Sequence, residues 1–405
     1  MSLLLRNAQV VQGGSAPTLP RASVLLEGDK IRAVGDEAET AHAVQVIEAA
    51  GRVLMPGFVD AHTHACWAGD RLDEWELKLR GASYLEILQA GGGILSTVRA
   101  VRAASQAELT TALSARLRLM LEYGSTTIEV KSGYGLSTVD ELKMLRAISD
   151  ASRAFPGTVV PTALLGHAMV PDQPDFVDVV IEETLPAVHE EFPGITVDAF
   201  CEEGAWSLVD CRQLLERARA LGHPLRLHAD QFHSLGGLEM ALELGAVSVD
   251  HLEVTRPENL ARLARSAAFG VVLPACGFHL DDRYANARAF LDAGGRLVLA
   301  TNYNPGSAPV FSMPFILALG VRKLGLRVQE VITASTATPA RLLGFSDRGR
   351  IAPGLRADLL LLRHHDERLL AYEVGSNPIE SVICGGRIIS PTYGCGSGTS
   401  LPLQA

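Results

Sequence analysis

Apolar runs and amphipathic stretches alternate along most of this chain. From residue 56 to about 345, short β-type runs are separated by segments with apolar residues at the three- and four-residue spacing of helices. The β-type runs are GFVDAHTH, TTIEVKSGYG, TVVPTALLGHA, ITVDAFCEEG, PLRLHADQF, AVSVDHLEV, FGVVLPACG and RLVLATNYNPG. Eight such runs, each followed by room for a helix, predict an α/β fold whose parallel sheet closes into a (β/α)8 TIM barrel.

The two ends of the chain have a different texture. Residues 1–55 hold the strand-like runs SLLLRNAQVVQ, ASVLLEGDKIRAVG and AVQVIEA, punctuated by Gly, Pro and Asp. Strand character returns near the C-terminus in ADLLLLRHH and ESVICGGRIIS. We therefore expect residues 1–55 and 346–405 to form one small β-sandwich domain. The barrel, residues 56–345, would then be an insertion between its two halves.

Composition limits the classes of protein that fit. The chain has 405 residues with a hydrophobic fraction of 47%, enough for a large barrel and a smaller companion. Its net charge of −10 argues against a nucleic-acid-binding surface. The six cysteines form no CxxC pair and indicate reduced thiols. No apolar run approaches about 18 residues, and no signal peptide is evident. We expect a soluble cytoplasmic protein that binds neither nucleic acid nor membrane.

Polar residues gather where the predicted barrel strands end. His62 and His64 are separated by one residue, so both imidazoles would point to the same face of a strand. The later strand ends carry Lys131 and Tyr134, His167, Glu202 and Glu203, His228 and Gln231, His251 and Glu253, and Asn302 and Asn304. These ends converge on one mouth of a barrel. A single buried histidine is most often a packed core residue, but five at corresponding ends favour a metal site.

The same segments resemble a known family. PGFVDAHTH is similar to the first metal motif of the amidohydrolase superfamily, whose members are metal-dependent hydrolases on a (β/α)8 barrel. GGGILSTVR, VKSGYGLSTVDELKMLR, LHADQF, VDHLEV and NPGSAPVFSMP resemble the imidazolonepropionase family, in the same order and over nearly the whole chain. The resemblance implies hydrolysis of 4-imidazolone-5-propanoate to N-formimidoyl-L-glutamate. It also implies a homodimer with one Zn²⁺ or iron ion per subunit.

The resemblance also assigns roles to individual residues. The implied metal ligands are His62, His64, His228 and the residue at position 302, and the implied substrate contacts are Arg71, Tyr84, Tyr134, His167 and Gln231. Asn304, Gly306 and Ser307 match the segment that holds the glutamate portion of the product. Arg71 suits a bidentate pair with the propanoate. Without the family context, Arg71 would be read as a surface partner of Asp73 or Glu74.

One position departs from the family pattern. The family has Asp at the metal position after the eighth strand, whereas this chain has Asn302 in ATNYNPG. An amide oxygen can coordinate a metal weakly, but a neutral amide cannot take up a proton. Three interpretations remain open: a natural variant with a substitute base, an inactive homologue, or an engineered change. Lys131 lies on the second predicted strand, whereas a carboxylated bridging lysine belongs on the fourth, so we do not expect a second, bridged metal.

The resemblance also implies a mechanism in which a metal-bound water and three further residues take part. The metal would lower the pKa of its bound water for attack on the ring carbonyl. His251 would stabilise the developing oxyanion, Gln231 would orient the ring, and Asn302 occupies the place of the usual proton carrier. Two alternatives stay open. The chain could be another cyclic amide or amidine hydrolase or a deaminase of the superfamily, or a ligand-binding homologue without catalysis.

Overall fold

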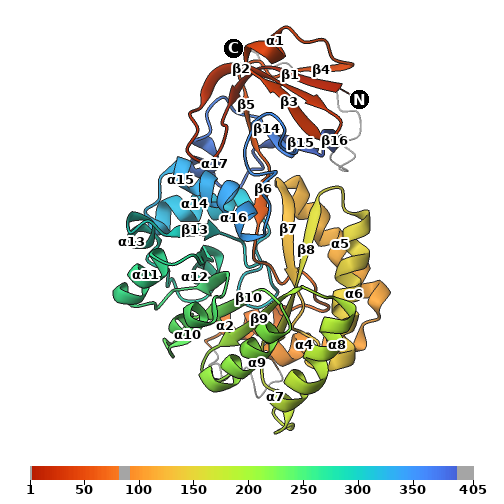
Figure 1. Ribbon diagram of the computed structural model, residues 1–405, viewed down its shortest axis with the longest axis vertical. Coiled ribbons are helices and arrows are strands. Elements are labelled where there is room, and N and C mark those ends of the chain that lie inside the picture. Colours follow the sequence, from red (N-terminus) through yellow and green to blue (C-terminus); the bar gives the residue numbers. More distant parts are fainter. Residues whose placement is uncertain (1, 82–91, 390–405) are drawn as a thin grey trace.

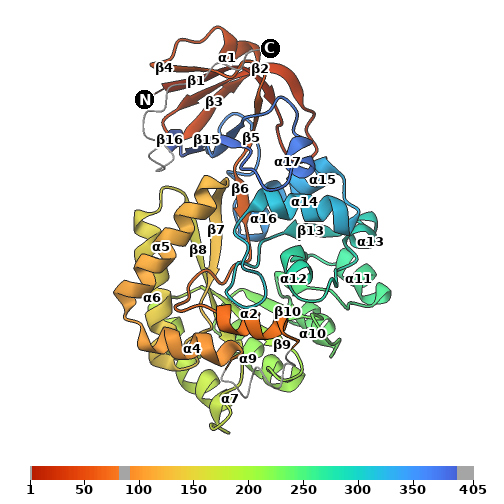
Figure 2. The same cartoon turned by 180° about the vertical axis from the view of Figure 1, so that it is seen from behind.

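The computed structural model describes residues 2–81 and 92–389. Its strands form two sheets, one parallel and one mixed. Figure 1 shows the mixed sheet at one end of the molecule, where strands from both ends of the chain lie side by side, and the helix-covered parallel sheet below it. Figure 2 shows the same arrangement from behind.

The parallel sheet contains all eight of the strands that the sequence pattern predicts. Its strands are β6 (Phe58–Asp60), β7 (Ser125–Lys131), β8 (Thr158–Gly166), β9 (Thr196–Cys201), β10 (Leu225–Ala229), β11 (Ser248–His251), β12 (Phe269–Val272) and β13 (Arg296–Leu299). They pair in chain order from β6 to β13. Most of their residues are buried, as expected for strands covered by helices on one face and packed inside a barrel on the other.

The barrel is joined between its first and last strands by the segments that follow them. The backbone N–H of Asn302 donates to the carbonyl of His62 at 3.0 Å, and His64 N–H donates to the carbonyl of Tyr303 at 3.0 Å. One step earlier, Thr301 donates its N–H and its hydroxyl to the carboxylate of Asp60. These bonds bring the residues after β13 directly beside the two histidines after β6. The predicted barrel is confirmed, with its closure made at the carboxyl ends of the strands.

Helices cover the outside of the barrel (Figure 1). They are α2 (Leu72–Leu79), α4 (Ile94–Ala103), α5 (Gln106–Glu122), α6 (Thr138–Ala154), α7 (Phe176–Val179), the π-helical η1 (Val180–Thr184), α8 (Leu185–Glu191), α9 (Leu208–Ala220), α10 (Gly237–Leu244), α11 (Pro257–Ala264), α12 (Pro274–His279), α13 (Ala287–Asp292), α14 (Met313–Leu324), α15 (Val328–Ala334) and α16 (Ala337–Leu342). Local sequence defines several starts: Ser105 forms a capping box with Glu108 before α5, and Ser137 and Ser207 cap α6 and α9. In the described part of the chain, no helix has both the length and the apolar character needed to cross a membrane.

The second sheet combines both ends of the chain, as the sequence predicts. Its strands are β1 (Ser2–Val10), β2 (Leu19–Glu27), β3 (Lys30–Val34), β4 (Gln45–Glu48), β5 (Val53–Pro56), β14 (Leu359–Leu362), β15 (Ile379–Cys384) and β16 (Arg387–Ile389). The short helix α1 (Asp36–Glu39) packs on β2 and β3, whereas α17 (Leu369–Tyr372), which follows β14, packs on α14 of the barrel. The long strand β1 pairs with β2 along one edge and with β4 and then β5 along the other. The small domain is thus built on one continuous hydrogen-bonded sheet with an apolar cluster on each face.

Alternation along β14 joins this sheet to the barrel. Leu359 and Leu361 belong to the apolar core of the terminal sheet, whereas Leu360 and Leu362 belong to the core of the barrel. Alternate side chains of a strand point to opposite faces, so this one strand serves both cores. The division into a domain of residues 1–55 with 346–405 and a barrel of residues 56–345 remains a proposal, which this sheet membership supports.

Candidate active site

Three histidines meet inside the barrel mouth. The ligand atoms of His62, His64 and His228 all lie within 4.8 Å of one another, and all three residues are buried. His64 Nε2 and His228 Nε2 are 3.4 Å apart. His62 and His64 come from the segment after β6, and His228 lies on β10, so the fold joins residues that are far apart in sequence. This is the trio that the sequence predicts to bind a metal.

A carboxylate lies behind two of the three imidazoles. His62 Nδ1 is 2.6 Å from Asp250 Oδ2, and His228 Nδ1 is 3.1 Å from Asp198 Oδ1. A carboxylate that accepts the Nδ1 proton fixes the tautomer and leaves the other ring nitrogen free to bind a metal. His62 Nε2 is fully buried and has no hydrogen-bond partner. Three neutral imidazoles with an orphaned, inward-facing nitrogen fit a Zn²⁺ or iron ion.

Two buried cations hold these carboxylates in place. Lys131 Nζ donates to Glu129 at 2.7 Å and to Asp198 at 2.9 Å, and Arg226 donates to Asp250 and lies 3.4 Å from Glu129. All five side chains are almost completely buried, so each charge requires a partner. The ammonium group of Lys131 is therefore engaged in two ion pairs.

Burial keeps the imidazoles neutral. It lowers the pKa of His62 and His64 well below the ordinary value for histidine, and the positive charge of Lys131 lowers both further. Burial also lowers the pKa of His228, although the neighbouring carboxylate of Asp198 opposes this shift. A neutral imidazole is the form that binds a metal, so the protonation state of the trio suits the predicted site.

Asn302 lies at the edge of the histidine trio. Its backbone adopts a left-handed conformation with φ of 55°, which asparagine tolerates better than most residues. The side-chain Nδ2 donates to Cys276 Sγ at 3.5 Å, whereas Oδ1 is buried without a partner. An unpartnered buried carbonyl oxygen is costly unless a further group satisfies it. The structure thus leaves Oδ1 of Asn302 without a hydrogen-bond donor among the described residues.

His251 and Gln231 complete the far side of the mouth. The ring centroid of His251 lies 5.5 Å from that of His228 and 6.0 Å from that of His62. His251 has φ of 90°, a conformation that is rare outside glycine and is found at functional sites. Gln231 is buried, and its Nε2 donates to Cys276 Sγ at 3.4 Å. His251 therefore lies against the trio, and Gln231 contacts Cys276, which clusters with His251.

Tyr134 and His167 lie on the other side of the trio. The imidazole of His167 stacks on that of His64 with centroids 5.1 Å apart, and the Tyr134 ring is 5.1 Å from His167. His167 Nδ1 is 2.8 Å from the carbonyl oxygen of Gly133. Burial lowers the pKa of His167 to about 3 and raises the pKa of Tyr134, so both are neutral and suited to hydrogen-bonding a polar ring.

The structure explains the family-specific string KSGYG, residues 131–135, which contains Tyr134. The buried carboxylate of Glu141 accepts from the backbone amides of Gly133, Gly135 and Leu136 at 2.7–2.9 Å. Gly133 has φ of 107°, and a Cβ there would lie 2.9 Å from His167 Nδ1. Glycine is therefore required for the loop to pass close to the histidine. Glu141 positions the loop, a role that the sequence pattern did not identify.

Arg71 is held by an ion pair beside the mouth. Its Nε donates to Glu74 Oε2 at 2.6 Å, which is one of the two pairings expected without the family context. The pair is nevertheless mostly enclosed, because the two side chains are only 11% and 10% exposed. The guanidinium also approaches Gly306, where a Cβ would be 2.9 Å from the nearest nitrogen. Arg71 thus lies against the segment predicted to hold the glutamate portion of the product.

Asn304 organises that segment. Its Oδ1 accepts from the amides of Gly306 at 2.8 Å and Ser307 at 2.7 Å, and its Nδ2 donates to the carbonyl of Asn302. The backbone amides of Gly306 and Ser307, which could otherwise bind a ligand carboxylate, thus already donate to the side chain of Asn304. Tyr84, the remaining predicted contact, lies outside the described residues.

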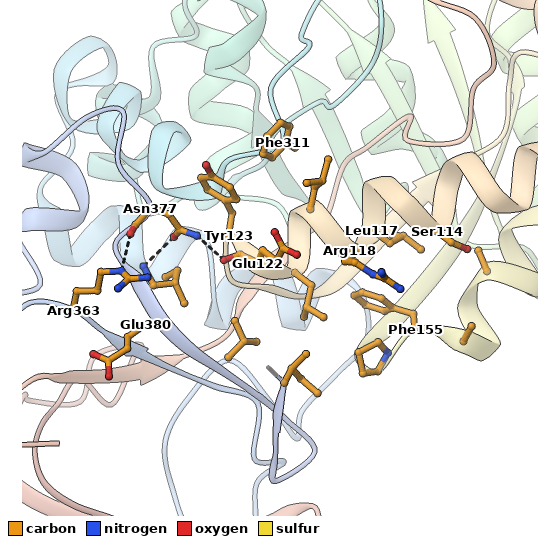
Figure 3. A pocket seen from close by; sticks show the side chains of 18 residues that line it. Ser114, Leu117, Arg118, Glu122, Tyr123, Phe155, Phe311, Arg363, Asn377 and Glu380 are labelled. Carbon is orange, nitrogen blue, oxygen red and sulfur yellow. Dashed lines mark hydrogen bonds between the residues drawn. The ribbon is translucent and has the colours of Figure 1, made fainter. Parts of the chain in front are cut away.

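A cavity of about 800 Å³ lies elsewhere, between α5, α6 and β15 (Figure 3). Its walls are largely apolar, with Leu117, Phe155 and Phe311 among them. Figure 3 shows that Arg363 and Asn377 at its edge bond to backbone carbonyls. None of the candidate active-site residues lines this cavity. The converging polar groups, rather than this volume, therefore mark the candidate active site.

Several residues that shape the site have no motif of their own in the sequence. They are Glu129, Glu141, Asp198, Arg226, Asp250 and Cys276. Four of them stand on strands: Glu129 on β7, Asp198 on β9, Arg226 on β10 and Asp250 on β11. Period-two spacing there places alternate side chains on the interior face of the barrel. That alternation was the only available signal, since their partners depend on the register between strands.

Comparison with known proteins agrees with this geometry. Residues 53–389 match the amidohydrolase family. The chain is 44% identical to the imidazolonepropionase of Herpetosiphon aurantiacus over 95% of this chain and 93% of that protein. It is 42% identical to the imidazolonepropionase of Deinococcus radiodurans, over 92% of this chain and 93% of the relative.

Solved structures show the same fold at lower identity. An adenosine deaminase from Xanthomonas campestris with bound zinc superposes with a TM-score of 0.71 at 18% identity, covering 95% of this chain and 92% of that one. N-isopropylammelide isopropylaminohydrolase from Burkholderia multivorans gives a TM-score of 0.69 at 21% identity, over 96% and 97% of the two chains. With its barrel, its histidine trio and these full-length relatives, the chain belongs to the imidazolonepropionase family of amidohydrolases.

Proposed function

We propose that this protein hydrolyses a ring C–N bond of 4-imidazolone-5-propanoate to give N-formimidoyl-L-glutamate. The observation that carries the proposal is the convergence of three kinds of group at one barrel mouth. They are the histidine trio, the paired rings of Tyr134 and His167, and the enclosed guanidinium of Arg71. Full-length relatives at 42–44% identity that are named imidazolonepropionase support the choice of substrate.

One Zn²⁺ or iron ion per subunit would be held by His62, His64 and His228, with Asn302 Oδ1 as a weaker fourth ligand. When bound, such an ion lowers the pKa of a coordinated water and polarises a carbonyl. Asp250 and Asp198 hold two of the imidazoles in the tautomer that exposes Nε2. Membership of the amidohydrolase family supports the presence of a metal ion. Elemental analysis of the purified protein would distinguish zinc from iron.

The chain's own residues position the substrate. Arg71 would pair with the propanoate, exchanging part of its contact with Glu74 for the ligand carboxylate. Tyr134 and His167 would bracket the ring from one side, and Gln231 would orient it from the other. His251 would donate a hydrogen bond to the carbonyl oxygen as negative charge develops there.

Proton transfer is the step that we expect Asn302 to slow. Ring opening requires that the attacking water lose a proton and that the departing ring nitrogen gain one. A carboxylate at position 302 would carry that proton, whereas the amide of Asn302 cannot. We therefore propose that substrate binds normally and that turnover is slow.

The test measures binding and turnover together. Hydrolysis of 4-imidazolone-5-propanoate should be detectable, and a non-hydrolysable analogue should bind the metal-loaded protein. Binding without turnover, unchanged in Asn302→Asp, would instead indicate a ligand-binding homologue. Turnover of an unrelated cyclic amide in preference to the imidazolone would indicate another hydrolase of the superfamily.

We also propose a homodimer, which rests on the family resemblance. Sedimentation or light scattering at micromolar concentration gives the mass directly. A single species of the mass of one chain, 43.2 kDa, would contradict it.

A further inference from the structure

A second cluster of metal-binding side chains lies beside the histidine trio. The ligand atoms of His251, Glu253 and Cys276 all lie within 4.8 Å of one another. His251 Nδ1 is 3.2 Å from Glu253 Oε1, and the two side chains are only 3% and 6% exposed. His251 ends β11, and Cys276 lies in α12 after β12, so neighbouring strands bring the three groups together.

The carboxylate of Glu253 lacks a positive counterpart. Within residues 2–81 and 92–389, it makes no ion pair with Lys or Arg, and His251 is its ion-pair partner. Its Oε2 is buried without a hydrogen bond. Glu253 and Cys276 also line a small cavity together with Gln231. A buried carboxylate that is not neutralised is costly, so this cavity favours a cation.

Two opposing influences act on the sulfur of Cys276. Burial raises the pKa of the thiol to about 12, so the thiolate forms only as a cation binds, whereas neighbouring side-chain amides donate hydrogen bonds to the sulfur. Two side-chain amides, Gln231 Nε2 and Asn302 Nδ2, donate to Sγ at 3.4 and 3.5 Å. Donors that converge on a cysteine sulfur stabilise the negative charge of a coordinating thiolate. One thiolate, one carboxylate and one imidazole together balance a divalent cation, and this mixture of donors suits Zn²⁺ and similar borderline-soft ions.

We propose that His251, Glu253 and Cys276 form a second site for a Zn²⁺-class cation, separate from the trio and weaker, whose occupancy inhibits hydrolysis. The site is weaker because the cation must displace the thiol proton, which passes to solvent, and the contact between His251 and Glu253. It inhibits because a cation on His251 withdraws that imidazole from the substrate carbonyl. The binding part stands independently of the proposed function, whereas the inhibition part rests on it.

The first test counts zinc. Metal-free protein, titrated with Zn²⁺ in equilibrium dialysis, should take up one tight and one weaker equivalent. Cys276→Ser and Glu253→Gln should each lose the weaker equivalent and keep the tight one, which also shows that the variants are folded. His228→Ala should lose the tight equivalent and keep the weaker one. The matched controls are Cys384→Ser, a buried thiol in the terminal sheet, and Glu258→Gln, an exposed carboxylate. Both should retain two.

The second test identifies the thiolate. Co²⁺ added to metal-free protein should give a near-ultraviolet charge-transfer band as the second equivalent binds, because only this site contains sulfur. The band should be absent in Cys276→Ser and present in Cys384→Ser. Unchanged stoichiometry in Cys276→Ser, or no charge-transfer band in the parent, would overturn the second site.

The third test measures inhibition by comparing the turnover of each protein with and without excess zinc. Zinc beyond the first equivalent should lower the turnover of the parent, while Cys276→Ser should give the same turnover with and without the excess. Turnover of the parent that ignores a bound second equivalent would overturn the inhibitory role. If the imidazolone is not hydrolysed at all, the proposed function fails, and the dialysis and cobalt results still decide whether the site exists.

Discussion

His62 Nδ1 lies 2.6 Å from Asp250 Oδ2, with both side chains completely buried. Asp250 in turn accepts from Arg226 and from the Ser248 hydroxyl, so the carboxylate that orients the imidazole is itself fixed from two sides. The direction of the His62 ring is therefore set by groups that lie behind it, on the side away from Nε2. Supports of this kind hold a ligand's tautomer and direction before the metal arrives.

Replacing that support should weaken metal binding. Asp250→Asn removes the negative charge and can present an N–H to His62 Nδ1, which favours the wrong tautomer. We expect the affinity for Zn²⁺ to fall by about 10- to 100-fold in a chelator competition. Asp292→Asn, an exposed partner of Arg288, is the control and should bind zinc as the parent does. Equal affinities in Asp250→Asn and parent would show that Asp250 does not orient His62.

Arg71 should control recognition of the propanoate. Loss of a charge-assisted pair in an enclosed site typically costs roughly 2–5 kcal/mol, so Arg71→Ala should weaken binding of a substrate analogue by at least about tenfold. Metal content should not change. Arg80→Ala is the control, because Arg80 follows the same helix and pairs with Glu76 in a more exposed position. If analogues without a carboxylate lose the same affinity, Arg71 does not bind the propanoate.

The buried histidines predict a pH dependence for the metal-free protein. The pKa of His167 is lowered to about 3, mainly by burial, whereas an unfolded chain has histidine near about 6.5. Between these two pKa values the unfolded state binds more protons at this residue than the folded state does. The contribution of His167 to the free energy of unfolding is therefore complete above about pH 6.5 and is lost as the pH falls towards about 3. His62, His64 and His228 shift in the same direction. Burial raises the pKa of Asp60 to about 7, and this shift acts in the opposite sense.

Urea unfolding of the metal-free protein at several pH values checks this sign. His167→Asn should remove part of the loss of stability between about pH 6.5 and about pH 4. His42→Asn, at an exposed position, should reproduce the slope of the parent. A slope in His167→Asn that matches the parent would mean that His167 does not titrate on unfolding.

The sequence predicted the eight barrel strands and the convergence of their ends because both follow from local periodicity and the geometry of parallel strands. It could not predict that Lys131 joins Glu129 to Asp198, because that contact depends on the register between β7 and β9. From the residues alone Arg71 was expected to pair with Asp73 or Glu74, and it was the family resemblance that assigned Arg71 to the propanoate. The structure places Arg71 on Glu74 inside an enclosed site, where both are compatible.

The small domain shows the same limit. Strand-like runs at both ends predicted that the termini pair, and they do. The sharing of β1 between β4 and β5 could not be foreseen, since it depends on how far one long strand extends past its neighbours. Cys276 carried no signal because its neighbours Gln231, His251, Glu253 and Asn302 come from the ends of three other strands or from the segments that follow them.

We predict that Asn302 limits the rate of hydrolysis. Its unpartnered Oδ1 and its position beside His62 leave a place for a carboxylate that would both hold a metal and carry a proton. General acid–base groups typically contribute about 10²- to 10⁴-fold, so Asn302→Asp should raise kcat by a factor in that range. Binding of a substrate analogue should change far less, because Arg71, Tyr134 and His167 are untouched. Asn286→Asp, which alters the cap of α13 at the surface, is the matched control and should leave kcat unchanged. Full activity in the parent that does not increase in Asn302→Asp would assign the proton to another group, with Glu253, which clusters with Cys276 beside Asn302, as the candidate.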